Sequence, residues 1–380
     1  METNQRVLIV GGGGIGSAAG LMIRELGEGT ADIYIADANG KAAEAAARWI
    51  SDGSDRQGLV EAVEIPKDGT NDAFVKVLRK ADVVLDCLPG SQAPRIAQLA
   101  REHGTHYANL TEYVRETEDV MKIADGADKG FVLQTGLAPG FIDVLANQLF
   151  RRFCREHGVD SVDSLSMKVG ALTRNAIAPT FYGFTWSPVG VATEYVEPAI
   201  VVRDSRKTTR PSLGERAPII VDGVVYEEAL TSGGAADLPD ALEGRVKTLD
   251  YKTLRHPGHY AWIDRVLSEI PEGNGRIAKL QERMEAEIPL VEDDFVVIYA
   301  AARGLDANRR SRVVEKSYMI EPMKVGARTL RAIQSTTAAP LVETARMLMT
   351  GKYRGVVLQS QIDPDEFMRG PFVSKVYGSK

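Results

Sequence analysis

The sequence predicts an α/β protein of two domains: a doubly wound parallel sheet, then an α+β domain with a mainly antiparallel sheet. Two observations predict this division. Through about the first third of the chain, apolar β-branched runs alternate with helical stretches, which is typical of a parallel sheet. After Gly140 the segments alternate apolar and polar residues instead, as strands with one buried face do.

The expected parallel strands are six apolar runs, separated by helical patterns such as 41–51 and 91–103. The runs span residues 6–11, 32–37, 60–66, 83–88, 106–110 and 131–136. Ligands of such a sheet bind outside the carboxyl ends of its strands, where the strand order reverses. We therefore expect the residues at the ends of strands four to six to face the ligand, namely Leu88, Pro89, Asn109 and Leu137.

A glycine loop follows the first strand, in the segment RVLIVGGGGIG. Gly11, Gly13 and Gly16 fit the dinucleotide fingerprint of a Rossmann domain, which allows a tight turn, close approach of a pyrophosphate and close packing of helix on strand. Gly14 and Ile15 open the helix, whose N-terminal amides attract phosphate. A glycine-rich turn of an unrelated fold is the alternative, but the strand, the helix and a distal acid all agree with the fingerprint.

Asp37 is that distal acid, at the end of the second strand. A carboxylate there accepts hydrogen bonds from the ribose diol and repels a 2′-phosphate. Because no arginine follows directly in Ala38-Asn39-Gly40, the sequence predicts NAD rather than NADP.

Composition excludes several classes of protein. The 380 residues are 44% apolar with a net charge of −6, and no basic run suggests a nucleic-acid partner. No apolar run approaches the roughly 20 residues that span a bilayer. Cys87 and Cys154 have no metal or redox spacing, so we expect reduced thiols, no metal site and a cytoplasmic protein. Because the first expected strand begins by Arg6, we expect no signal peptide.

The second domain is expected to hold a helix over 141–156 and then strands. Residues 164–172 and 216–228 alternate, the latter around a hairpin signal at Asp222-Gly223, and 294–304 and 310–320 form another strand pair. A flat antiparallel sheet of this kind often pairs with a second copy, so we expect a homodimer. A last helix is expected over 333–351, ending at Gly351.

Several motifs resemble the saccharopine dehydrogenase-like family over essentially the whole chain. They are THYANLTE (105–112), TGLAPGFIDVLANQL (135–149), TWSPVGVATEYVEP (185–198), LTSGGAADLPDALEGRV (230–246) and LDYKTLRHPGH (249–259). The last three are most similar to one branch, the lysine 6-dehydrogenases. The resemblance implies a Rossmann domain over 1–136 completed by 333–380, and a substrate-binding and dimerisation domain over 137–332.

The resemblance also implies hydride exchange at a carbon–nitrogen bond. Lysine 6-dehydrogenation needs a general base near the ε-amine, an anchor for the α-carboxylate, an acceptor for the α-ammonium, and exclusion of water. Glu112, just after the fifth strand, is a candidate base or ammonium acceptor, and Asp143 a candidate that orients the amine or ribose. Both acids also suit the first turn of a helix, which is the structural alternative.

Arg255 is the candidate carboxylate anchor, because a guanidinium binds a carboxylate through two parallel hydrogen bonds. His259 is a candidate proton shuttle, and Thr231 and Ser232 open a small-residue loop whose amides and hydroxyls suit a carboxylate. The alternatives are a salt bridge for Arg255, a structural role for His259 and a plain connecting loop.

Three functions stay open at this level. The first is NAD-dependent oxidative deamination of the ε-amino group of L-lysine, whose semialdehyde product cyclises to piperideine-6-carboxylate. The second is a saccharopine or carboxynorspermidine dehydrogenase that acts on a secondary amine, of an amino acid or a polyamine. The third is a non-catalytic NAD-binding regulator.

Overall fold

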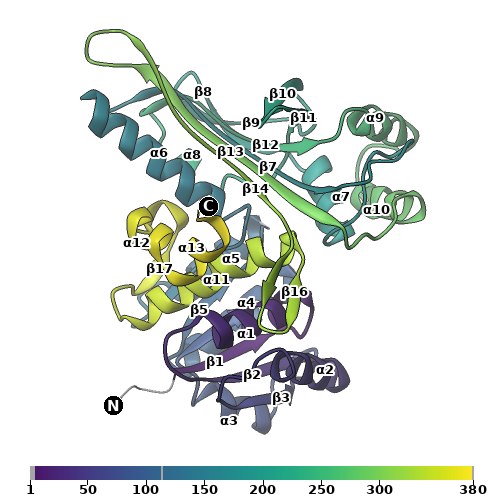
Figure 1. Cartoon of the computed structure of the whole chain (residues 1–380), viewed down its shortest axis with the longest axis vertical. Coiled ribbons are helices and arrows are strands. Elements are labelled where there is room, and N and C mark those ends of the chain that lie inside the picture. The colour runs from purple at the N-terminus through teal and green to yellow at the C-terminus, as the bar shows by residue number, and fades with distance from the viewer. Residues whose placement is uncertain (1–4, 113, 379–380) are drawn as a thin grey trace. The chain divides into compact units, whose positions relative to one another are not determined.

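The computed structural model describes residues 5–112 and 114–378, and the chain divides into two compact units. The Rossmann unit comprises the chain up to Phe141, residues 323–330 and the chain from Gln334 onward; the second unit comprises 142–322 and 331–333. The first boundary therefore falls a few residues after the expected position at 136. Figure 1 colours the returning C-terminal segment yellow.

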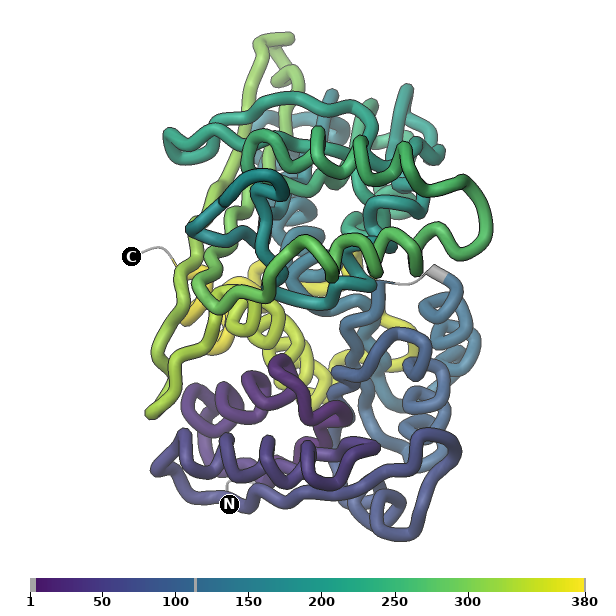
Figure 2. The backbone as a smooth tube through the Cα atoms, turned by 90° about the vertical axis from the view of Figure 1, so that its right-hand side faces the viewer, coloured from purple at the N-terminus to yellow at the C-terminus, as the bar shows by residue number. Residues whose placement is uncertain are grey.

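The Rossmann unit contains a seven-stranded parallel sheet in the order β17-β6-β5-β4-β1-β2-β3. Its strands are β1 (Gln5–Val10), β2 (Ala31–Asp37), β3 (Val60–Glu64), β4 (Val83–Asp86), β5 (His106–Asn109), β6 (Gly130–Val132) and β17 (Gly355–Val357). The order reverses between β1 and β4, which confirms the predicted doubly wound sheet. Pairing of β17 with β6 brings the tail into this unit, and Figure 2 shows the yellow tail among its blue segments.

The helices of this unit either connect successive parallel strands or follow the last strand, β17. They are α1 (Gly14–Leu26), α2 (Gly40–Ser51), α3 (Asp72–Leu78), the short η1 (Gly90–Gln92), α4 (Ala93–Glu102) and α5 (Val114–Ala124), with α11 (Ala332–Met349), η2 (Gln359–Gln361), α12 (Pro364–Arg369) and α13 (Pro371–Tyr377) in the tail. A small hairpin, β15 (Met323–Val325) and β16 (Arg328–Leu330), also belongs to this unit.

The second unit is built on an eight-stranded sheet, in the order β10-β11-β12-β7-β13-β14 with β8 and β9 attached to β12. Its strands are β7 (Val162–Thr173), β8 (Ala199–Arg203), β9 (Arg206–Arg210), β10 (Ala217–Val221), β11 (Val224–Leu230), β12 (Val246–Arg255), β13 (Asp294–Leu305) and β14 (Ser311–Ile320). The sheet is mainly antiparallel as predicted, but its central pair, β7 and β12, is parallel. The predicted hairpin joins β10 to β11, with positive φ at Asp222 (49°) and Gly223 (83°).

The helices of the second unit are more numerous than the sequence suggested. They are α6 (Phe141–His157), which was expected, and α7 (Pro188–Val196), α8 (Leu238–Ala241), α9 (His259–Glu269) and α10 (Arg276–Glu287). The prediction of strands without regular helices was wrong for 259–287, where two amphipathic helices pack on one apolar cluster through residues such as Trp262, Ile263, Leu280 and Met284. The many charged residues on the exposed faces of these helices made their helical period of 3.6 residues hard to recognise in the sequence.

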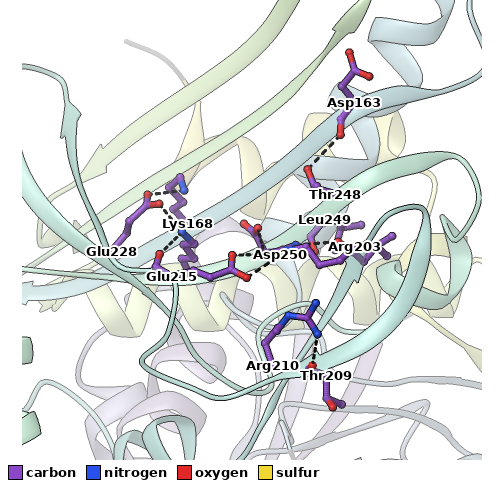
Figure 3. Close-up of polar contacts among 12 residues, drawn as sticks. Asp163, Lys168, Arg203, Thr209, Arg210, Glu215, Glu228, Thr248, Leu249 and Asp250 are labelled. Atoms are coloured by element: carbon purple, nitrogen blue, oxygen red, sulfur yellow. Dashed lines mark hydrogen bonds and ion pairs between the residues drawn. The ribbon is translucent and has the colours of Figure 1, made fainter.

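A buried ion network lies on one face of this sheet (Figure 3). Lys168 on β7 and Lys252 on β12 are register partners, so their side chains emerge side by side. Glu228 separates the two ammonium groups, with one oxygen 2.5 Å from Lys168 Nζ and the other 2.8 Å from Lys252 Nζ. All three residues are buried. Two like charges are therefore held together by one shared carboxylate.

Arg203 extends the network, between Glu215 at 2.5 Å and Asp250 at 2.8 Å, while Lys252 also donates to the backbone carbonyl of Glu215. The six charges balance, with three cations and three carboxylates, and every ionised group here has a counterion. The network is thus a structural feature of the sheet.

No helix within the described residues is long and apolar enough to cross a membrane.

Candidate functional site

The glycine loop forms an open cradle before α1. Gly11 has φ +112°, and a Cβ there would lie 2.8 Å from the carbonyl oxygen of Cys87; a Cβ on Gly16 would lie 2.0 Å from the carbonyl oxygen of Gly11. By contrast, no described atom lies within 4 Å of a Cβ built on Gly13, which is exposed with Gly14. The N-cap of α1 makes no side-chain hydrogen bond. The loop thus offers open space before the first turn of α1, whose amides have no partner within the helix, and this fits a pyrophosphate.

Asp37 ties this cradle to the second strand. Its Oδ2 accepts from the Gly12 amide at 2.9 Å and its Oδ1 from the Asn39 amide at 2.9 Å. Asn39 in turn caps α2 through the Lys41 amide. The carboxylate is only partly buried, so its remaining lone pairs can still accept from a ribose diol.

The loop after β4 is held by Asp86, a residue that sequence analysis did not select. This buried carboxylate accepts from the Tyr107 hydroxyl at 2.7 Å and from the Leu88 amide at 3.1 Å. Burial raises the pKa of Asp86 to about 6, although both hydrogen bonds oppose the shift. Asp86 therefore fixes the backbone of Leu88 and Pro89, at the carboxyl edge predicted for the cofactor.

The ends of β5 and β6 supply the remaining predicted groups of the Rossmann unit. Asn109 is buried, its Oδ1 accepts from the Gln134 amide at 2.9 Å, and its Nδ2 donates to no described residue. Leu137 is buried in a tight loop in which Phe141 N donates to the Gly136 carbonyl. Glu112 is half-buried, and burial raises the pKa of its carboxyl group against a hydrogen bond from its own amide. A raised pKa makes it a better proton acceptor near neutral pH.

In the second unit, Arg255 is the largest of the fully buried side chains. Its guanidinium lies over the ring of Tyr182, 4.6 Å from the centroid, and its Nε donates to the Tyr195 hydroxyl at 2.7 Å. Its Nη1 donates to the Leu254 carbonyl, and its Nη2 donates to no described residue. No carboxylate of the described residues forms an ion pair with it, although Glu194 contributes a favourable charge. A buried, permanently charged guanidinium without a counterion suits a bound carboxylate.

His259 belongs to a hydrogen-bonded chain that holds this arginine. Its Nδ1 lies 2.7 Å from the Thr180 carbonyl, which only accepts, so Nδ1 carries the proton and Nε2 is an acceptor. The Tyr195 hydroxyl, 3.0 Å away, then donates to Nε2 while it accepts from Arg255. Burial first, and the charge of Arg255 second, lower the pKa of His259 to about 3. A neutral histidine with both nitrogens engaged suits positioning better than the predicted proton shuttle.

Thr231, Ser232 and Asp143 lie on elements around the same cluster. The Thr231 hydroxyl is 2.7 Å from that of Thr253, two residues before Arg255 on β12. Ser232 donates through its amide to the Glu194 carbonyl at 3.1 Å. Asp143 is wholly buried on α6. The pKa of Tyr251 is raised first by burial of its ring, and further by the charges of Glu194 and Asp143.

Alternation along β12 explains this grouping, because Tyr251, Thr253 and Arg255 share one face of the strand. Neither Tyr182 nor Tyr195 was assigned a catalytic role from the sequence. The alternation was visible in the sequence, but nothing there indicated which loop and helix would bring these two rings to Arg255.

Two family models cover the chain almost end to end. The model for the saccharopine dehydrogenase NADP binding domain matches residues 7–133, and that for the saccharopine dehydrogenase C-terminal domain matches residues 136–376. The chain belongs to the saccharopine dehydrogenase family. It therefore carries a nicotinamide dinucleotide-binding domain and is a nicotinamide-dependent oxidoreductase of that family, which confirms the predicted family and cofactor class.

Solved structures of this fold agree with that membership. Apo saccharopine dehydrogenase (L-Glu forming) from Saccharomyces cerevisiae has a TM-score of 0.76 at 16% identity, over 99% of this chain and 98% of that one. Homospermidine synthase from Legionella pneumophila, in complex with NAD, has a TM-score of 0.71 at 14% identity, over 99% and 90%. This saccharopine dehydrogenase family member thus shares its fold with both neighbours over nearly its whole length.

Replacing Tyr195 by phenylalanine tests the chain that holds Arg255 in this family member. The variant leaves Arg255 Nε and His259 Nε2 buried without a partner, so we expect the free energy of unfolding to fall by about 1–3 kcal/mol in urea. Tyr182→Phe is the matched control: it keeps the ring over Arg255 and removes a buried hydroxyl with no described partner, so stability should hardly change. Equal stabilities of the two variants would contradict the assigned chain.

Proposed function

We propose that this protein is an NAD-dependent dehydrogenase that oxidises the 6-carbon of L-lysine. A base takes a proton from the ε-ammonium, the C6 hydride leaves, and a carbon–nitrogen double bond forms. Water then adds to this imine and ammonia leaves, which gives the 6-semialdehyde. Attack of the α-amine on the aldehyde, with loss of water, closes piperideine-6-carboxylate. When bound, the oxidised nicotinamide supplies the hydride acceptor.

The buried guanidinium of Arg255 carries this proposal. The other buried cations of the second unit, Lys168 and Lys252, are both neutralised by Glu228, which leaves Arg255 as the described buried cation without an ion pair. A single carboxylate anchor fits free lysine. A secondary-amine substrate such as saccharopine carries further carboxylates and would favour a second, separate anchor.

The remaining roles follow from charge and burial. Glu112, whose pKa is raised, is our candidate base for the ε-ammonium. Asp143, wholly buried, is our candidate acceptor for a substrate ammonium. Tyr195 and His259 position Arg255, and the Thr231 hydroxyl and Ser232 belong to the loop beside it. Asn109 Nδ2 and the backbone of Leu88 and Pro89 would hold the nicotinamide end of the cofactor.

NAD is the proposed form of the cofactor, because Asp37 presents a carboxylate beside the glycine loop. Homospermidine synthase, of the same fold, is described in complex with NAD. Homodimerisation and a cytoplasmic location stay predictions from the sequence.

A panel of amines tests the proposal. Purified protein is mixed with NAD and L-lysine, saccharopine or a diamine, and NADH formation is followed by absorbance. We expect NADH with L-lysine and little with the others. Turnover of saccharopine but not lysine would replace the proposal by its secondary-amine alternative. No NADH with any amine, from protein that binds NAD, would favour a non-catalytic regulator.

A further inference from the structure

We infer that Glu64 is a second specificity residue of the dinucleotide site, and that it acts with Asp37 to exclude cofactors with a 2′-phosphate. The inference rests on the proposed use of NAD and names a residue outside the glycine fingerprint. Glu64 ends β3, the strand next to β2.

The geometry places the Glu64 carboxylate beside the ribose end of the site. Glu64 and Asp37 are register partners at the carboxyl ends of adjacent parallel strands, about 4.8 Å apart. The Glu64 side chain extends over the start of α2, since a Cβ on Gly40 would lie 2.7 Å from its Oε2. A 2′-phosphate is attached where Asp37 meets the 2′-hydroxyl, so it would enter the field of both carboxylates.

The two carboxylates differ in what else they do. Both carboxylate oxygens of Asp37 accept hydrogen bonds, from the amides of Gly12 and Asn39. Replacing Asp37 therefore also loosens the glycine loop and the turn before α2. The Glu64 side chain makes no hydrogen bond or ion pair within the described part of the chain and is exposed. Its charge is therefore available to act on a ligand, and its removal leaves the loops intact.

The neighbouring lysines do not cancel the negative field of Asp37 and Glu64. Lys41 is the basic residue of the turn and first helical positions, 38–41, and its side chain is exposed. Lys67 lies beyond the end of β3 and is also exposed. Two carboxylates at adjacent strand ends outweigh these solvated ammonium groups for a doubly negative phosphate.

The decisive experiment compares Glu64→Gln with Glu61→Gln, which removes the same charge from the exposed amino end of the same strand, about 10 Å away. Dissociation constants for NAD and NADP are measured by calorimetry without an amine. We expect Glu64→Gln to lower the Kd ratio of NADP to NAD about 3- to 10-fold, and Glu64→Lys to lower it further. Glu61→Gln should change it less than about 2-fold, and added salt should shrink the Glu64 effect.

Equal ratios in the two glutamine variants, or an unchanged ratio in Glu64→Lys, would overturn the inference while leaving the proposed amine oxidation intact. Absence of binding of either dinucleotide to the parent protein would overturn both. Melting curves check that the variants fold, which exposed positions should allow.

Discussion

Replacing Arg255 by glutamine is expected to lower kcat/KM for L-lysine on the order of 10²–10³-fold. The variant removes the described buried cation of the second unit that lacks an ion pair, and with it the proposed bidentate anchor for the α-carboxylate. Because an anchor remote from the reacting carbon binds the ground state and transition state alike, most of the loss should appear as a higher KM. Arg255→Lys keeps the charge but not the planar fork, so an intermediate loss is expected. Steady-state kinetics measure both.

The control for this prediction is a substrate without the carboxylate. 1,5-Diaminopentane carries the same reacting amine, so wild type and Arg255→Gln should oxidise it with similar kcat/KM. An equal loss on both substrates would show that Arg255 only supports the fold. Affinity for NAD should be unchanged, since the role proposed for Arg255 is binding of the substrate carboxylate.

Replacing Glu228 by glutamine is expected to lower the free energy of unfolding by about 3–5 kcal/mol. Glutamine nearly preserves the volume but removes the shared counterion, so Lys168 and Lys252 become two adjacent buried charges. Denaturation in urea measures the loss. Lys168→Met should cost less, because it leaves one Lys252–Glu228 pair. Glu156→Gln, which breaks an exposed pair with Arg152, should leave the midpoint nearly unchanged.

The same cluster gives stability a pH dependence. Burial raises the pKa of Glu228, but the charge and hydrogen bond of Lys168, and then Lys252, outweigh it, so the pKa lies below its ordinary value. A lowered folded pKa contributes stability above the unfolded pKa of about 4.3. That contribution is lost as the pH falls through the folded value, and Glu228→Gln should lack it. A variant as stable as wild type at neutral pH would contradict the network's role.

The Rossmann unit could be predicted from the sequence because its signals are local. A buried strand, Gly11, Gly13, Gly16 and Asp37 lie within one short segment, and the strand order follows from the rules for parallel sheets. The structure adds what local patterns do not encode, such as Asp86, whose role depends on Tyr107 from a different strand.

The second unit was less predictable because its site is assembled from distant segments. Arg255 was selected for its chemistry, but its neighbours Tyr182 and Tyr195 come from a loop and a helix some 60–70 residues earlier. Lys252 lies three residues earlier on the same strand. Only the register of β7 and β12, with Glu228 on β11, assigns it to the ion network. Long-range pairing of this kind leaves no period in the sequence.

Hydride transfer from the carbon that bears the ε-amine is the central claim, and label transfer tests it most directly. L-Lysine with deuterium at both hydrogen positions of carbon 6 is incubated with the protein and NAD, and the reduced cofactor is examined by mass spectrometry. We expect one deuterium per NADH formed. NADH without deuterium, or no NADH from protein that binds NAD, would contradict it.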